Sequence, residues 1–131
     1  MEVAEDSLGI TEFRILNNVD VAIDNSFQPL AHWSVSHYSA TDSLEELDDT
    51  TSFALCVTGM ESKQIVFDHF RQKIGLSRQQ FPNLAHSTSY ISPSVTTTHG
   101  LLLEPKSIIS ACSKIGFGVT VKRGCNVGHH A

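Results

Sequence analysis

Branched apolar residues recur at every sixth position from residue 91 onward. The series is Ile91, Leu103, Ile109, Ile115, Val121 and Val127, with Thr97 as its one polar member. An α-helix repeats near 3.6 residues and a half-buried strand near two, so neither element produces this period. A six-residue repeat places one apolar side chain on the axis of a parallel β-helix at every short strand. The pattern therefore predicts a solenoid that begins at about residue 81.

The positions around the inward residues agree with such a coil. Seven of the eight inward positions counted from Ala85 are apolar, although only 40% of the chain is hydrophobic. Ser107 and Ser113 stand two residues before an inward position, and Gly116 and Gly128 directly follow one. We expect small side chains where the coil is narrowest and glycine where its corners need unusual backbone angles. The alternative, unrelated short strands in a small sandwich, does not require a constant register.

Composition limits the partners. The 131 residues carry a net charge of −5 with scattered lysines and arginines, so nucleic acid is a poor partner. No apolar run approaches the roughly 20 residues that span a bilayer, and no signal peptide opens the chain. We therefore expect no membrane contact and a cytoplasmic location. Cys56, Cys112 and Cys125 lack paired CxxC spacing, which predicts buried reduced thiols and no metal site.

The first eighty residues show alternating strand and helix patterns. Apolar runs at residues 19–23 and 53–57 predict buried parallel strands, and residues 61–74 predict an amphipathic helix that Gly75 ends. A Ser-x-x-Glu capping box at residues 43–46 predicts a short helix, and another is expected where Ile10, Phe13 and Leu16 share one face. We thus expect a small α/β unit over residues 1–80 with a partial Rossmann-like parallel sheet, followed by the coil over residues 81–131.

Polar residues follow both predicted strands. Asp24 and Asn25 end the first strand, and Thr58 and Gly59 end the second. Ligands of parallel α/β sheets bind beyond the carboxyl ends of the strands, so these four residues are candidate substrate-binding residues. The alternative is that Asp-Asn and Thr-Gly only form turns. No glycine-rich phosphate-binding loop is present.

Three segments together resemble the sugar O- and N-acetyltransferases of the sialic acid and bacillosamine type. They are residues 81–93 (FPNLAHSTSYISP), 53–59 (FALCVTG) and 124–130 (GCNVGHH). The resemblance implies a left-handed parallel β-helix and a homotrimer in which acetyl-CoA, the co-substrate, lies between neighbouring coils. It also implies that the N-terminal unit binds a nucleotide-linked or sialic-acid-like sugar.

The same resemblance assigns the catalytic base. The family's general base is a histidine just after a coil corner, which corresponds to His129. A neutral imidazole can take the proton of the attacking sugar group at cellular pH. Direct transfer needs no acyl-enzyme, because binding alone can bring the base and the thioester together. Relatives often carry a carboxylate after this histidine, whereas this chain has His130, a candidate base-orienting residue. We expect no metal at this pair because adjacent strand residues point to opposite faces. His86, near the start of the coil, is expected to make a turn hydrogen bond.

The coil is shorter than the family pattern implies. Residues 85–131 cover about two and a half turns of 18 residues, which predicts a truncated coil with an incomplete acetyl-CoA site. Three hypotheses follow. The chain belongs to an acetyltransferase, it is a non-catalytic sugar-nucleotide-binding or assembly module, or it is a truncated remnant of such an enzyme.

Overall fold

The computed structural model describes residues 1–19, 26, 28–39, 42, 44, 47 and 50–131. The N-terminal elements are α1 (Glu2–Leu8), β1 (Glu12–Leu16), β2 (Ser34–Tyr38), α2 (Met60–Ile74) and the 3₁₀ helix η1 (Arg78–Gln80). Eight two-residue strands follow: β3 (Leu84–Ala85), β4 (Tyr90–Ile91), β5 (Thr96–Thr97), β6 (Leu102–Leu103), β7 (Ile108–Ile109), β8 (Lys114–Ile115), β9 (Thr120–Val121) and β10 (Asn126–Val127).

Among the described residues, the N-terminal sheet has two parallel strands, β1 and β2. The predicted helix through Ile10, Phe13 and Leu16 is wrong, because the helical segment is α1 and it ends at Gly9 in the left-handed conformation (φ 69°). Beyond Gly9 the chain is extended, and the Phe13 ring packs edge-on against Trp33 with centroids 5.4 Å apart. This contact joins residues far apart in sequence, so a local pattern does not reveal it.

The two predicted strands have different outcomes. Residues 20–23 lie outside the described residues, as do Ser43, Glu45 and Glu46 of the predicted capping box. Residues 53–57 form no strand, so that prediction is wrong. The main-chain N–H of Phe53 donates to the carbonyl of Gln80 (2.9 Å), and Phe53 and Leu55 pack against the core instead. The alternation of apolar residues in this segment therefore reflects the packing of one side of an extended chain against the core.

Helix α2 confirms the prediction for residues 61–74. Gly75 closes it in the left-handed conformation (φ 72°). Phe67 and Phe70 are buried and pack with Leu76 and Phe81 in the first of two hydrophobic clusters. Helix α2 thus supplies the core of the N-terminal half.

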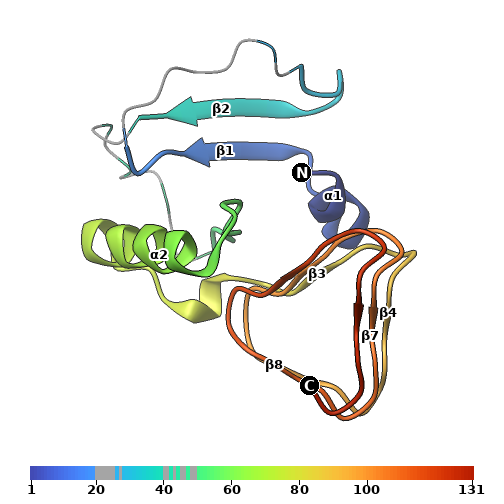
Figure 1. The fold of residues 1–131 in the computed structure, drawn as a ribbon. Coiled ribbons are helices and arrows are strands. Elements are labelled where there is room, and N and C mark those ends of the chain that lie inside the picture. The colour runs from blue at the N-terminus through green and yellow to red at the C-terminus, as the bar shows by residue number, and fades with distance from the viewer. Residues whose placement is uncertain (20–25, 27, 40–41, 43, 45–46, 48–49) are drawn as a thin grey trace.

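Residues 84–127 form a three-sided coil. Leu84 pairs with Leu102, which pairs with Thr120, so each coil turn takes 18 residues. Three parallel sheets result, which we call the first face (β3, β6, β9), the second face (β4, β7, β10) and the third face (β5, β8). Figure 1 shows the three faces as the sides of a triangle. The predicted inward register is confirmed at Leu103 and Ile109, which are 0% exposed, and at Val121, which is 5% exposed. Thr97, the polar member of the series, is exposed.

The N-terminal elements lie on the side of the first face (Figure 1). The Phe81 ring contacts Phe67 of α2 and Phe117 of the coil, with centroids 5.7 and 5.4 Å away. The Lys63 ammonium, in the first turn of α2, donates to the Gly118 carbonyl (2.7 Å) and the Thr120 hydroxyl (2.6 Å). Burial lowers the pKa of Lys63, and the nearby Lys122 charge lowers it further. Side chains on both sides of residue 80 therefore share one core.

The coil corners use left-handed backbone at every sixth residue. The positions with positive φ are Gly100, Lys106, Cys112, Gly118, Gly124 and His130. The expectation that Gly116 and Gly128 supply the corner angles is wrong, because neither has positive φ. The small residues are placed as predicted, since Ser107 is 0% exposed and Ser113 is 1% exposed. Three non-glycine residues thus occupy backbone conformations that favour glycine.

The strained corners lead to a stability prediction. Lys106 has φ 59° and an exposed side chain, and its N–H donates to the Thr88 hydroxyl, a bond that glycine keeps. We expect Lys106→Gly to raise the free energy of unfolding by about 0.5–1 kcal/mol, because relief of left-handed strain outweighs the added unfolded-state entropy. Lys114→Gly, on an exposed strand position without positive φ, is the control and should lower it by a similar amount. Both free energies are measured by chemical denaturation. Changes of the same sign for the two substitutions would contradict the left-handed corner at Lys106.

The three cysteines are reduced, and all have exposed side chains. The prediction that they are buried is therefore wrong. The parallel register places Cys125 directly next to Ser107, which is fully buried. Cys125 itself is exposed because it lies on the last described coil turn, and no described residue covers it.

Candidate functional site

The predicted substrate-binding residues are only partly described. Asp24 and Asn25 lie outside the described residues. Thr58 and Gly59 are exposed and immediately precede α2, and Gly59 is its N-cap with φ 88°. No side chain caps the first turn of α2. The structural role of Gly59 is therefore to adopt the positive φ with which the chain enters α2.

His129 and His130 form a close pair. Their Nδ1 atoms are 2.9 Å apart, and the rings are perpendicular with centroids 5.1 Å apart. Both residues lie in the corner after β10 rather than on a strand, so the reason given for keeping their side chains apart is wrong. His130 adopts φ 60°, and its N–H donates to the Ala111 carbonyl (3.0 Å). The coil thus fixes the corner while both side chains remain exposed.

The contact between the two Nδ1 atoms restricts the protonation of the rings. A neutral imidazole carries one N–H and one lone pair, so one Nδ1 donates and the other accepts. The donating ring then has an unprotonated Nε2, and the accepting ring has a protonated Nε2. The pair therefore offers one basic nitrogen and one N–H to the solvent. Either ring can be the donor with the same heavy-atom positions.

The histidine pair is remote from the N-terminal elements of its own chain. Its corner joins the second and third faces, and Figure 1 shows the C-terminus at the vertex of the triangle away from α1 and α2. Among the described residues, no hydrogen bond joins Thr58 or Gly59 to His129. One chain therefore does not bring these predicted site residues together.

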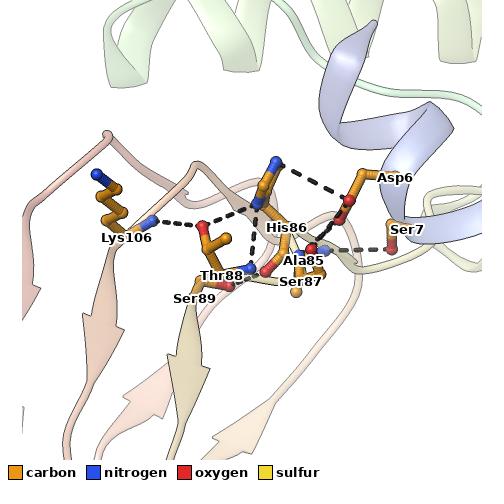
Figure 2. Close-up of polar contacts among 8 residues, drawn as sticks. All are labelled: Asp6, Ser7, Ala85, His86, Ser87, Thr88, Ser89 and Lys106. Carbon is orange, nitrogen blue, oxygen red and sulfur yellow. Dashed lines mark hydrogen bonds and ion pairs between the residues drawn. The ribbon is translucent and has the colours of Figure 1, made fainter.

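A second polar cluster joins α1 to the coil (Figure 2). The Asp6 carboxylate accepts hydrogen bonds from the main-chain N–H of Ser87 (2.6 Å) and its hydroxyl (3.0 Å). These bonds, the main-chain one first, lower the pKa of Asp6. The hydroxyl of Ser7 accepts from the N–H of Ala85 (3.3 Å). The sequence reasoning missed this cluster because its members are about eighty residues apart.

His86 belongs to the same cluster. Its Nδ1 accepts the N–H of Thr88 (3.1 Å) and lies 2.9 Å from the Thr88 hydroxyl, which confirms the predicted turn hydrogen bond. Because Nδ1 accepts, the ring proton lies on Nε2, which is 4.0 Å from Asp6. Asp, His and Ser thus meet as in a catalytic triad, but the Ser87 hydroxyl donates to Asp6 and not to His86. This arrangement holds α1 on the coil and does not activate a nucleophile.

The Asp6 cluster leads to a pH prediction. The folded-state pKa of Asp6 is lowered, so its contribution to stability is present above the unfolded value of about 4 and is lost as the pH falls through the folded value. We expect the free energy of unfolding at pH 7 to be higher for the wild type than for Asp6→Asn, and we expect this difference to shrink as the pH falls below about 4. Urea unfolding across this range measures it, and Asp68→Asn on α2 is the control. A difference that grows on acidification would contradict the arrangement.

The described residues contain no group of three or more His, Cys, Asp or Glu side chains that is suited to hold a metal ion. Within the same part of the chain, no helix combines the length and apolar content needed to cross a bilayer. No match was found among protein-family models, curated proteins or solved structures.

Proposed function

We propose that this chain belongs to an acetyl-CoA-dependent acetyltransferase that acts on a nucleotide-linked amino sugar or a sugar hydroxyl in the cytoplasm. The observation that carries the proposal is the exposed His129–His130 pair, whose Nδ1 atoms are 2.9 Å apart at a fixed coil corner. The 18-residue coil turns support it, since they agree with the left-handed parallel β-helix of the sugar acetyltransferases that the sequence resembles.

His129 acts as the general base in this proposal. When its Nδ1–H donates to His130, its Nε2 is free to take the proton of the sugar amine or hydroxyl as that group attacks the thioester. His130 then occupies the place of the orienting carboxylate. Acetyl-CoA is the second substrate, and holding both substrates together is sufficient for direct transfer.

A homotrimer completes the proposed site. The second face carries exposed apolar side chains, with Tyr90 56% and Ile108 39% exposed, so it offers surface for a neighbouring coil. The C-terminus, two residues after His129, lies away from the N-terminal elements of its own chain (Figure 1). We therefore propose that the sugar nucleotide is held by Thr58 and Gly59, with Asp24 and Asn25, of one protomer and meets His129 of another.

Thiol release tests the proposal. The full chain is incubated with acetyl-CoA and a panel of nucleotide-linked amino sugars and sialic-acid-like sugars, while free thiol and acetylated sugar are measured. We expect both products with at least one sugar and a trimer in sedimentation velocity. No thiol release above the enzyme-free rate with any member of the panel would contradict the catalytic proposal.

A non-catalytic binding or assembly module is the second candidate. The position of α2 away from the C-terminus (Figure 1) favours it, because ligand binding by Thr58 and Gly59, just before α2, does not need the coil corner. Calorimetry with the same sugar nucleotides separates the candidates. Binding without thiol release supports the module, whereas release with dependence on His129 supports the enzyme.

A further inference from the structure

We propose that His129 and His130 form a two-histidine proton relay, in which one ring deprotonates the attacking group and the other protonates the leaving thiolate of an acyl thioester. This inference rests on the proposed acyl transfer. It gives His130 a chemical role beyond the orientation of its neighbour. The role follows from what the pair presents to the solvent at its two outer nitrogens.

The geometry is that of two rings facing each other through Nδ1. The Nδ1 atoms are 2.9 Å apart, a normal hydrogen-bond length, and the ring centroids are 5.1 Å apart. The corner is held by the His130 N–H bond to Ala111 (3.0 Å) and by the hydroxyl of the buried Ser113, which donates to the Gly128 carbonyl (2.8 Å). The two outer nitrogens are therefore set in place by the coil and are open to substrates.

The outer nitrogens are complementary. The internal hydrogen bond uses one N–H and one lone pair, so the ring that donates keeps a lone pair at Nε2 and the ring that accepts keeps an N–H at Nε2. A carboxylate in place of His130 would accept the same hydrogen bond but would have no further N–H to give. His130 thus adds a general acid, its Nε2–H, beside the general base His129.

The proton transfers balance. The O–H or N–H bond of the sugar breaks and an N–H bond forms at His129 Nε2. The proton on His129 Nδ1 passes to His130 Nδ1, and the N–H bond at His130 Nε2 breaks as an S–H bond forms. In the same reaction the sugar gains a bond to the acyl carbon and the C–S bond of the thioester breaks. The pair ends with the same number of protons, but the tautomers of the two rings are reversed. Because both rings are exposed, proton exchange with solvent restores the starting tautomers.

Nitrogen-15 NMR of the full chain tests the pair without substrate. When both rings are neutral, the pair shares one Nδ1–H, so we expect the Nδ1–H fractions of the two rings to add up to about one, whichever ring is the donor. In His130→Gly, which suits the left-handed corner at φ 60°, His129 should revert to the tautomer mixture of exposed His99. Two Nε2–H rings in the wild type would overturn the relay and leave the proposed function intact.

Kinetics test the transfer itself. His130→Asn keeps a residue that tolerates left-handed backbone and can accept the His129 hydrogen bond, but it cannot pass a proton on. We expect it to reduce the rate of thiol release by about 10–100-fold, which is less than the 10²–10⁴-fold typical of general acid–base catalysis because the general base His129 is retained. The rate should also be measured against the fraction of deuterium in the solvent. We expect a curved dependence for the wild type, in which more than one proton moves, and a linear dependence for His130→Asn, in which one proton moves. A wild-type rate in this variant would overturn the relay, whereas no release by the wild type would overturn the proposed function as well.

Discussion

Ile109→Ala lowers the free energy of unfolding by about 2–5 kcal/mol, the range for removing a fully buried aliphatic side chain. Ile109 is 0% exposed and lies on the coil axis, where the parallel register aligns it with Ile91 on one side and Val127 on the other. Alanine would leave a cavity between two coil turns that the hydrogen-bonded backbone cannot close. Urea unfolding followed by circular dichroism measures the loss.

The neighbouring residue supplies the control. Ile108 has the same side chain, lies on the same strand and points outward with 39% exposure. Ile108→Ala should change the free energy of unfolding by less than about 1 kcal/mol in the monomeric chain, because it creates no cavity. Equal losses for the two substitutions would mean that the six-residue register does not mark the coil axis.

For the proposed acetyl transfer, we expect His129→Gln to reduce the rate of thiol release by about 10²–10⁴-fold, the contribution typical of a general base. The amide of glutamine cannot take the proton of the proposed sugar substrate, although it keeps the polarity and approximate size of the side chain. Because His129 is exposed and precedes the left-handed residue of its corner, the fold should be unchanged. Initial rates at saturating acetyl-CoA, with the unfolding midpoint as a check, test this result.

His99→Gln is the matched control for the base. His99 is another exposed coil histidine, and its carbonyl, rather than its ring, accepts a hydrogen bond from Gly118 (3.1 Å). We expect wild-type rates from this variant. Equal rates from both variants would remove His129 from the mechanism and leave the coil as a scaffold.

The coil was predictable because its pattern is local and repeated. Each inward residue follows the last by six positions, so the exposures of Leu103, Ile109 and Val121 follow from spacing alone. The corners were not predictable, since Lys106 and Cys112 adopt left-handed backbone that composition does not favour. There the hydrogen bonds between coil turns outweigh local preference, as when the Thr88 hydroxyl accepts the N–H of Lys106.

The N-terminal half was less predictable because its contacts are distant in sequence. Residues 53–57 have a strand-like alternation, yet they pack on α2 and the coil without a strand partner. The segment after Gly9 has helical spacing but pairs with β2. In both places the energy of packing against distant residues exceeds the small local preference for helix or strand.

The candidate site divides in the same way. The spacing from the coil register placed His129 at a corner, but strand geometry wrongly separated it from His130. The sequence by itself determined the length of the repeat and its inward residues, because successive inward positions are always separated by six residues of the chain. Only the tertiary structure decided that Lys63 and Asp6 attach the N-terminal helices to the coil and that His129 and His130 share a hydrogen bond. Those contacts depend on backbone angles and on partners that no local pattern specifies.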